Sequence, residues 1–223
     1  MNDRDHSGTT AGGEAEITLG LLEVVHENST VTQRNVAGQL GIALGLTNAY
    51  LKRCVKKGLI KVKQVPPNRY AYYLTPKGFT EKSRLTAEYL SSSFNYFRRA
   101  RRECGELMER CLARGWRRIA LCGTSELGEI AVLCAREHDV ELIGFIAMGR
   151  NSEPHAEHYS GLPVISSLID IGPVDAVIIT DLMNPQSSFD DLRRLIAADR
   201  ILTPRLLRVT RAANMSGNNG SRT

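Results

Sequence analysis

The sequence predicts an α/β protein in three parts: two short helices followed by a two-stranded ribbon, one long helix, and a small parallel sheet covered by helices. Three observations predict this organisation. Helical patterns give way to alternating ones within residues 17–75, helical spacing then continues to about Arg114, and strand patterns alternate with helical ones from Trp116 onward.

The charge of the chain is unevenly distributed. Residues 52–118 hold 18 Lys and Arg against 5 Glu, whereas the rest of the chain holds 11 basic and 19 acidic residues. A region with such an excess of cations suits a polyanion, and the acidic remainder would be repelled by one. We therefore expect the two regions to do different jobs.

Hydropathy and cysteine content indicate the compartment. No apolar run approaches the ~20 residues of a membrane-spanning helix, and the N-terminus does not read as a signal peptide. The five cysteines form no C-x-x-C pair, so neither a disulfide framework nor a zinc site is expected. The pattern predicts a cytoplasmic protein with reduced thiols.

The first part reads as helices joined by a tight turn. Residues 1–16 are polar and are expected to be a disordered tail, and Ile17–Asn28 is predicted as the first helix. A second helix starts at Thr32 and ends at Gly41, and a third runs from about Leu46 to Lys57. The short glycine-containing link between the last two is typical of a helix-turn-helix.

The third helix has two expected faces. Thr47, Leu51, Cys54 and Val55 recur at intervals of three and four, so they are expected to face a core, which leaves an outward face of amides and cations: Asn48, Lys52, Arg53 and Lys56. Residues 59–65 and 70–74 then read as two strands around the turn Pro66–Arg69, which places Arg69 where a wing reaches a minor groove.

These residues carry a family resemblance. The run TQRNVAGQLGIALGLTNAYLKRCVKKGLIKV, followed by YAYYLTPKGFTEKSRLT, resembles the MarR-type winged-helix regulators over residues 17–90, most closely the branch associated with exopolysaccharide gene clusters. The resemblance implies a winged helix-turn-helix that binds double-stranded DNA. The predicted DNA contacts are Thr32, Gln33, Arg34, Thr47, Asn48, Tyr50, Lys52, Arg53, Lys56, Lys63, Asn68 and Arg69. The alternative is a winged helix that binds protein.

A long helix is predicted from Thr75-Pro76 to about Arg114, with Ser91–Ser93 and Gly105 as possible interruptions. Its apolar residues need burial: Leu85, Tyr89, Phe94, Phe97, Leu107, Met108, Cys111 and Leu112. Packing against a second copy would make a homodimer whose operator is an inverted repeat, with half-sites about one helical turn apart. Alternatively, the helix folds back on its own domain.

The last part reads as a parallel sheet with covering helices. The expected strands are 118–123, 140–147, 163–165, 175–180 and 205–209, and the expected helices are 129–137 and 189–198. Such sheets bind ligands at the carboxyl ends of their strands. The predicted cleft, where a helix N-terminus meets an anion, consists of Gly123, Thr124, Ser125, Leu127 and Gly128.

The motifs RRIALCGTSELGEIA, ELIGFIAMGR, YSGLPVISSL and VDAVIIT resemble the Rossmann-like nucleotide-binding domain of sugar acyltransferases and polysaccharide-assembly proteins, over residues 116–183. The chain departs from the dinucleotide fingerprint at Ser125, where glycine is expected, and at Ala147–Arg150, where an acidic residue is expected. NAD is therefore disfavoured, whereas a nucleotide, a nucleotide sugar, another phosphorylated metabolite or NADP, with Arg150 against a phosphate, stays compatible with the sequence. Alternatively, the sheet has lost its ligand and serves assembly.

No catalytic set is recognisable. Ser125 does not lie in a G-x-S-x-G turn, and His155 and His158 are spaced as a metal pair but have no third ligand nearby. Asp175 and Asp181, which flank a strand, are expected to cap or to be solvated. Redox sensing through Cys122 is a weaker option.

The sequence thus predicts a non-enzymatic, dimeric transcriptional regulator that senses a nucleotide-type metabolite. By resemblance it controls surface or exopolysaccharide genes. Its expected parts are the tail, a winged domain (17–78), a connecting helix (79–115), a Rossmann-like domain (116–210) and a second disordered tail (211–223). The alternative is a DNA-binding and oligomerisation module whose C-terminal sheet holds no ligand.

Overall fold

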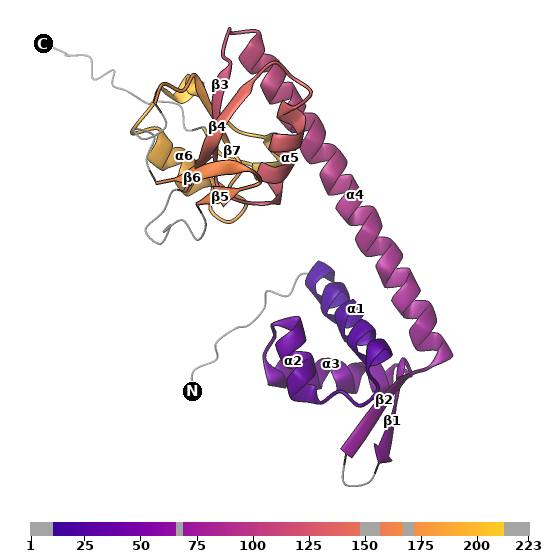
Figure 1. Ribbon diagram of the computed structural model, residues 1–223. Helices are drawn as coiled ribbons and strands as arrows, with labels where there is room; N and C mark the ends of the chain where they lie inside the picture. Colours follow the sequence, from indigo (N-terminus) through magenta and orange to yellow (C-terminus); the bar gives the residue numbers. More distant parts are fainter. Residues whose placement is uncertain (1–10, 66–68, 148–156, 167–171, 212–223) are drawn as a thin grey trace, which may run out of the picture. The chain divides into compact units, whose positions relative to one another are not determined.

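The computed structural model describes residues 11–65, 69–147, 157–166 and 172–211 (Figure 1). The chain forms two compact units, residues 1–94 and residues 95–223. The boundary falls inside one helix, α4 (Pro76–Leu112), so its 37 residues are shared between the units. None of the helices in the described ranges combines the length and apolar character needed to cross a membrane.

The N-terminal unit is a winged helix-turn-helix, as predicted. Its elements are α1 (Ala11–Glu27), α2 (Gln33–Leu40), α3 (Leu44–Lys56), β1 (Ile60–Val65) and β2 (Arg69–Leu74). The strands form an antiparallel pair, with Ile60 opposite Leu74 and Val65 opposite Arg69. The predicted start of the first helix was wrong. The helix α1 begins six residues before Ile17, so residues 11–16, which were predicted as part of a disordered tail, are helical.

Local residues set the helix ends of this unit. The Thr32 hydroxyl accepts a hydrogen bond from Asn35 N–H at 3.2 Å and so caps α2. Gly41 ends α2 in the left-handed region at φ 62°, which glycine adopts without steric cost. The Thr75 hydroxyl accepts from Gly78 N–H at 3.0 Å, so Thr75 starts α4 as predicted.

The core of the unit is made by all three helices and the ribbon. Leu21, Leu22, Val36, Leu51, Cys54, Ile60 and Tyr72 are among its buried side chains. The start of α4 adds Leu85 to this core.

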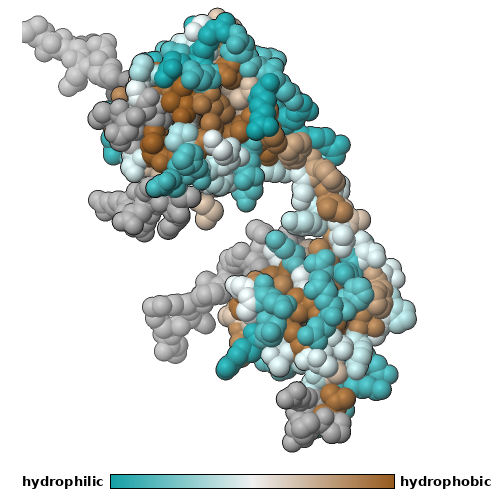
Figure 2. Space-filling model, viewed as in Figure 1, coloured by the Kyte–Doolittle hydropathy of each residue, from teal (hydrophilic) through white to brown (hydrophobic). Residues whose placement is uncertain are grey.

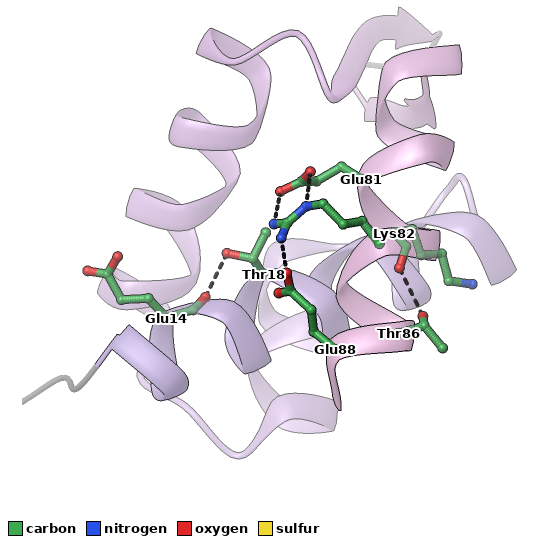
Figure 3. A network of polar contacts seen from close by, with 7 residues as sticks. Glu14, Thr18, Glu81, Lys82, Thr86 and Glu88 are labelled. Atoms are coloured by element: carbon green, nitrogen blue, oxygen red, sulfur yellow. Dashed lines mark hydrogen bonds and ion pairs between the residues drawn. The ribbon is translucent and has the colours of Figure 1, made fainter. Parts of the chain in front are cut away.

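On the exposed side of α4, Arg84 binds both Glu81 and Glu88 (Figure 3). These pairs span three and four residues, and because their side chains are largely exposed they contribute little to stability. The helix continues without a break through Ser91–Ser93 and Gly105, the two possible interruptions of the predicted helix.

The C-terminal unit is a six-stranded sheet that is parallel except at one edge. Its strands are β3 (Arg118–Cys122), β4 (Glu141–Ile146), β5 (His158–Tyr159), β6 (Leu162–Ile165), β7 (Ala176–Ile179) and β8 (Ile201–Leu202), in the order β5-β6-β4-β3-β7-β8. The edge strand β5 is antiparallel to β6 and was not expected. The predicted last strand was also wrong, because Arg205–Leu207 is a 3-10 helix and the ladder ends at Ile201–Leu202.

Helices cover both faces of this sheet, with α5 and α6 on opposite sides (Figure 1). On one face, α5 (Glu126–Ala135) and the end of α4 bury Ile119, Leu121 and Phe145. On the other, α6 (Pro185–Leu192) buries Ala120, Val177 and Ile179. Both helices start before their predicted positions, because Ser125 caps α5 and Pro185 occupies the first turn of α6.

Candidate nucleic-acid interface

A groove of about 490 Å³ runs between the recognition helix α3, the start of α2 and the ribbon. Its lining combines an apolar floor with a polar and cationic rim: Gln33, Asn48, Leu51, Lys52, Val55, Lys56, Val62, Tyr70 and Tyr72. The groove lies wholly within the N-terminal unit. A concave surface rimmed by lysines and amides is suited to sugar, phosphate and base edges of a nucleic acid.

Helical spacing explains the cationic rim. Asn48, Lys52 and Lys56 are four residues apart, so they occupy one strip of α3. Both lysines are exposed and Asn48 is half-buried, which is the outward placement that the sequence predicts. Their contact with DNA stays a prediction.

Burial argues against two of the predicted DNA contacts on α3. Thr47 is 0% exposed and its hydroxyl donates to the Ala43 carbonyl at 3.2 Å, while Tyr50 is 4% exposed within the core. Conversely, Val55 was expected in the core and is 39% exposed, where it lines the groove. The core-facing strip of α3 is therefore centred on Thr47, Tyr50, Leu51 and Cys54.

Arg53 lies on the other edge of α3. Its guanidinium pairs with Glu14 of α1 at 3.0 Å and sits 5.1 Å from the centroid of the Tyr50 ring. Both partners of the ion pair are 47% exposed, so the pair is worth at most about 1 kcal/mol. As a DNA contact, Arg53 would have to exchange Glu14 for a phosphate, which this weak pairing allows.

The other predicted contacts come from α2 and the ribbon. Gln33 donates through Nε2 to the Tyr72 hydroxyl at 3.1 Å, and Thr32, Arg34 and Lys63 are exposed. Asn68 and the Arg69 side chain lie outside the described residues.

Sequence reasoning did not single out Tyr70, which is 57% exposed and lines the groove together with Lys52 and Lys56. The available signal was its spacing from Tyr72, because residues two apart in a strand lie on the same face, and both line the groove.

The predicted cleft of the C-terminal unit lies at the carboxyl ends of β3 and β7. The strand order reverses between these two strands, the usual place for a ligand in such a sheet. Here, however, the two loops approach each other closely. Gly123 has φ 102°, and a Cβ at this position would lie 2.6 Å from Asp181 Cα. Because Gly123 has no side chain, the loop that carries Asp181 can pack directly against its backbone.

The single O–H donor of Ser125 is used within the protein, which argues against Ser125 as a donor to a bound phosphate. The hydroxyl donates to the Thr180 carbonyl at 2.5 Å and accepts from Gly128 N–H at 3.3 Å. Gly128 and Leu127 are buried, and a Cβ on Gly128 would lie 2.6 Å from Phe145 Cε1. Thr124 is exposed, and the predicted phosphate partner Arg150 lies outside the described residues.

Charge at this edge opposes an anion. Glu126 and Glu129 occupy the first turn of α5, where a carboxylate complements the helix dipole that a phosphate would otherwise use. The Glu129 carboxylate also accepts from the Tyr159 hydroxyl at 2.9 Å, and burial, together with this bond, raises the pKa of Tyr159 to about 12.

The two aspartates that flank β7 cap backbone, as expected. Asp175 accepts from Arg117 and Arg118 N–H, both at 2.9 Å, and these bonds lower its pKa. Asp181 accepts from Met183 and Asn184 N–H. No group of three or more potential metal ligands occurs within the described ranges, and His155 lies outside them.

Redox sensing through Cys122 does not fit its surroundings. The side chain is 0% exposed, and burial raises the pKa of its thiol to about 12. Reactive cysteines need a substantial thiolate fraction and access for the oxidant. Cys122 has neither.

The comparisons with known proteins bear on the N-terminal unit. Residues 14–61 match the family model described as winged helix-turn-helix DNA-binding. None of the curated proteins matches the chain significantly. The N-terminal unit is thus similar in sequence to winged helix-turn-helix DNA-binding domains over these residues.

Among solved structures, the chain is similar to the Staphylococcus aureus MepR–DNA complex (21% identity, TM-score 0.32, 37% of this chain and 59% of that one). It is also similar to a point mutant of Lactococcus lactis ZitR (19%, 0.32, 43% and 63%). The chain thus spans less than two thirds of both. Human N-acetylserotonin methyltransferase with SAM is similar over 91% of this chain and 81% of its own (13%, 0.31). At these TM-scores none of them informs function.

Proposed function

We propose that the protein is a sequence-specific transcriptional regulator that binds double-stranded DNA as a homodimer. The observation that carries this proposal is the groove of the N-terminal unit, where Lys52 and Lys56 of α3 stand beside Asn48, Gln33 and Tyr70. The lysines supply phosphate contacts, the two amides can pair with an adenine edge, and Tyr70 can pack on a sugar or base. A protein-binding winged helix has no need for this combination.

Fluorescence anisotropy with labelled duplexes tests the proposal. The full chain is titrated onto fragments of the region upstream of its own operon and onto scrambled duplexes of the same composition. We expect one upstream fragment to bind at least about 10³-fold more tightly than its scrambled control at the same salt concentration. Equal affinity for all duplexes, or no binding at low salt, would refute it.

The dimer is proposed to form through the middle of α4. At both ends of α4, apolar side chains that were expected to need a partner are buried within the chain itself. Leu85 lies in the core of the N-terminal unit, and the core of the C-terminal unit contains Leu107, Met108 and Cys111. Between them, large apolar side chains stay exposed: Tyr89 (53%), Leu90 (47%), Phe94 (58%), Tyr96 (37%) and Phe97 (39%). Brown residues follow this part of α4 in Figure 2.

Helical geometry places these side chains on one stripe, because the intervals from Tyr89 to Phe97 and from Leu90 to Phe94 are whole multiples of four residues. A contiguous exposed apolar stripe marks an interaction site. A second copy of α4 is the occupant we propose, since a two-fold pair of winged domains matches an inverted-repeat operator.

Light scattering after gel filtration tests this interface. The pair Tyr89→Glu and Phe97→Glu should convert a dimer into a folded monomer, because two carboxylates on each helix would have to be desolvated. Ser91→Glu and Asn95→Glu add the same charge on the opposite side of α4 and should leave the dimer intact. A monomeric wild-type chain, or a dimer that survives the first pair, contradicts the proposal.

For the C-terminal unit, we propose that the sheet serves assembly, with sensing of a nucleotide-type metabolite as the competing proposal. The strand order supports sensing, but the internally bonded Ser125 and the acidic first turn of α5 argue against an anionic ligand. A thermal-shift screen with nucleotides, dinucleotides and nucleotide sugars separates the two. A ligand at 100 times its dissociation constant adds about 2.7 kcal/mol, so a clear shift would establish sensing.

We also propose which genes the protein controls and that it catalyses no reaction. The resemblances over residues 17–90 and 116–183 favour genes of surface or exopolysaccharide synthesis, and no catalytic role is proposed for any residue. Transcript levels of such genes in a deletion strain, compared with the complemented strain, test the first. Unchanged transcripts would remove it.

A further inference from the structure

A buried tyrosine of the ribbon is hydrogen-bonded to the side-chain amide of Gln33 in the groove of the N-terminal unit. Gln33 is the first residue of α2 and is half-buried, and its Nε2 donates to the Tyr72 hydroxyl at 3.1 Å. Both residues line the groove that also contains Asn48 and Lys52. The hydrogen bond therefore joins α2 to β2 at the surface proposed to contact DNA.

The Tyr72 side chain is held in place by the core. It is 5% exposed and belongs to the buried cluster of the N-terminal unit. Its backbone N–H donates to the Ser29 carbonyl at 2.7 Å, and Tyr72 lies opposite Val62 of β1 in the ladder. Because packed core side chains stay in one rotamer on average, the surrounding core fixes the position of the Tyr72 hydroxyl.

The bond to Tyr72 restricts a side chain that is otherwise flexible. A glutamine has three side-chain torsions, the last of which is broad, so an unbonded carboxamide at a groove samples many orientations. Ordering such a side chain during binding costs conformational entropy. Because Tyr72 orders the Gln33 amide in the free protein, less of this cost falls on binding.

The same bond determines which polar atoms of Gln33 remain for a ligand. A carboxamide has two N–H donors and one carbonyl acceptor. Tyr72 takes one N–H, and the Gln33 side chain makes no further hydrogen bond within the part of the chain that the structure describes. The remaining N–H and Oε1 match the N7 acceptor and the N6 amino donor of adenine in the major groove. A phosphate, which offers acceptors only, would leave Oε1 without a partner.

We propose that Tyr72 is a positioning residue that holds the Gln33 carboxamide for recognition of one adenine in each half-site. The inference rests on the proposed function and assigns a role in base selection to a core side chain. The groove lysines give affinity for any duplex, whereas Gln33, held by Tyr72, selects among duplexes.

Anisotropy with a set of operator duplexes tests this role. Each base pair of one half-site is replaced in turn, and binding is measured for the wild type, Gln33→Ala and Tyr72→Phe. In the wild type, replacement of one adenine should weaken binding on the order of 10-fold. Gln33→Ala should bind all four base pairs equally at that position. Tyr72→Phe should reduce the discrimination there by about 5-fold, as expected for the loss of one hydrogen bond.

Further readouts separate positioning from a structural role. Tyr72→Phe keeps the ring in the core, so its melting temperature, its affinity for scrambled duplexes and its salt slope should stay close to the wild-type values. The control is Tyr73→Phe, which removes a 42% exposed hydroxyl-bearing side chain's O–H from the next position of β2 and should leave the discrimination unchanged. If Tyr72→Phe weakens binding evenly at every base pair, or keeps full discrimination, the inference is overturned while the proposed function stands.

A measurement without DNA tests the contact itself. In nitrogen-15 NMR spectra of the full chain, the side-chain NH₂ of Gln33 is identified by its loss in Gln33→Ala. Its proton shifts should differ from those of free glutamine in the wild type and should return toward them in Tyr72→Phe. Free-glutamine shifts in the wild type overturn the inference. If the shifts respond as expected but every duplex binds equally, the proposed function fails, and the adenine contact fails with it.

Discussion

Replacing Lys52 and Lys56 by alanine is expected to weaken DNA binding about 30-fold at roughly 0.15 M salt. Both lysines are exposed on one strip of α3 and line the same groove, and neither ammonium takes part in an ion pair among the described residues. Each phosphate contact contributes about −0.9 to the slope of log K against log salt. Two lost contacts therefore flatten the slope by about 1.8. Taken from a reference of about 1 M salt down to about 0.15 M, this difference in slope corresponds to the stated loss of about 30-fold.

The assay is anisotropy of one labelled operator duplex across a series of salt concentrations. The control variant carries Lys77→Ala and Lys82→Ala, which remove the same charge from α4 of the same unit. It should keep nearly the wild-type slope. If both double variants flatten the slope equally, the effect is one of overall charge, and the assignment of the groove as the DNA-contacting surface is refuted.

Further predictions concern stability. The buried Glu103 carboxylate accepts from Arg99 Nε at 2.9 Å and from Leu206 N–H at 2.7 Å; burial raises its pKa, but these bonds outweigh burial and lower it. Its contribution is therefore present above the unfolded pKa of about 4.3 and is lost as pH falls through the folded value. Glu103→Gln should cost about 1.5–3 kcal/mol at neutral pH, and the difference in urea midpoint should shrink in acid; a constant difference would contradict this. Gly78→Ala should destabilise by about 1–3 kcal/mol, because its Cβ would collide with the Leu59 carbonyl oxygen. Gly38→Ala, inside α2 with nothing within 4 Å of the new Cβ, should instead stabilise by about 0.5–1 kcal/mol, and thermal unfolding of both variants checks the opposite signs.

Periodicity alone located every helix of the N-terminal unit but misjudged one face of α3. The sequence shows Val55 as apolar and Tyr50 as polar-tipped, so the core strip was centred one position away from its true place. The structure buries Tyr50 in the core cluster of the unit and exposes Val55, which lines the groove beside the ribbon. Which neighbour covers a helix edge is a tertiary property that spacing does not encode.

The glycine turn of the C-terminal unit shows the same limit. Gly123 and Ser125 were correctly placed between a strand and a helix, and Ser125 is a recognisable helix cap, whereas Gly128 lies inside α5. The sequence does not show that Thr180, 55 residues later, takes the Ser125 hydroxyl, or that Asp181 fills the space above Gly123. These long-range contacts decide whether the turn faces a ligand or the protein itself.

Sequence reasoning also missed short elements, because their length is too small to show a pattern. The two-residue strands β5 and β8 carry too few residues for a period to appear, and the apolar run Arg205–Val209 imitates a strand. In the structure, Leu206 N–H binds Glu103, which holds this segment as a 3-10 turn against α4.

Nuclease footprinting of the full chain on the region upstream of its own operon tests the central claim most directly. The account predicts two protected half-sites in inverted orientation, with centres about 10 base pairs apart or a multiple of that spacing. A single unrepeated half-site would contradict the dimer. Absence of any protected site, with the Lys52 and Lys56 variant indistinguishable from wild type, would contradict DNA recognition by the groove.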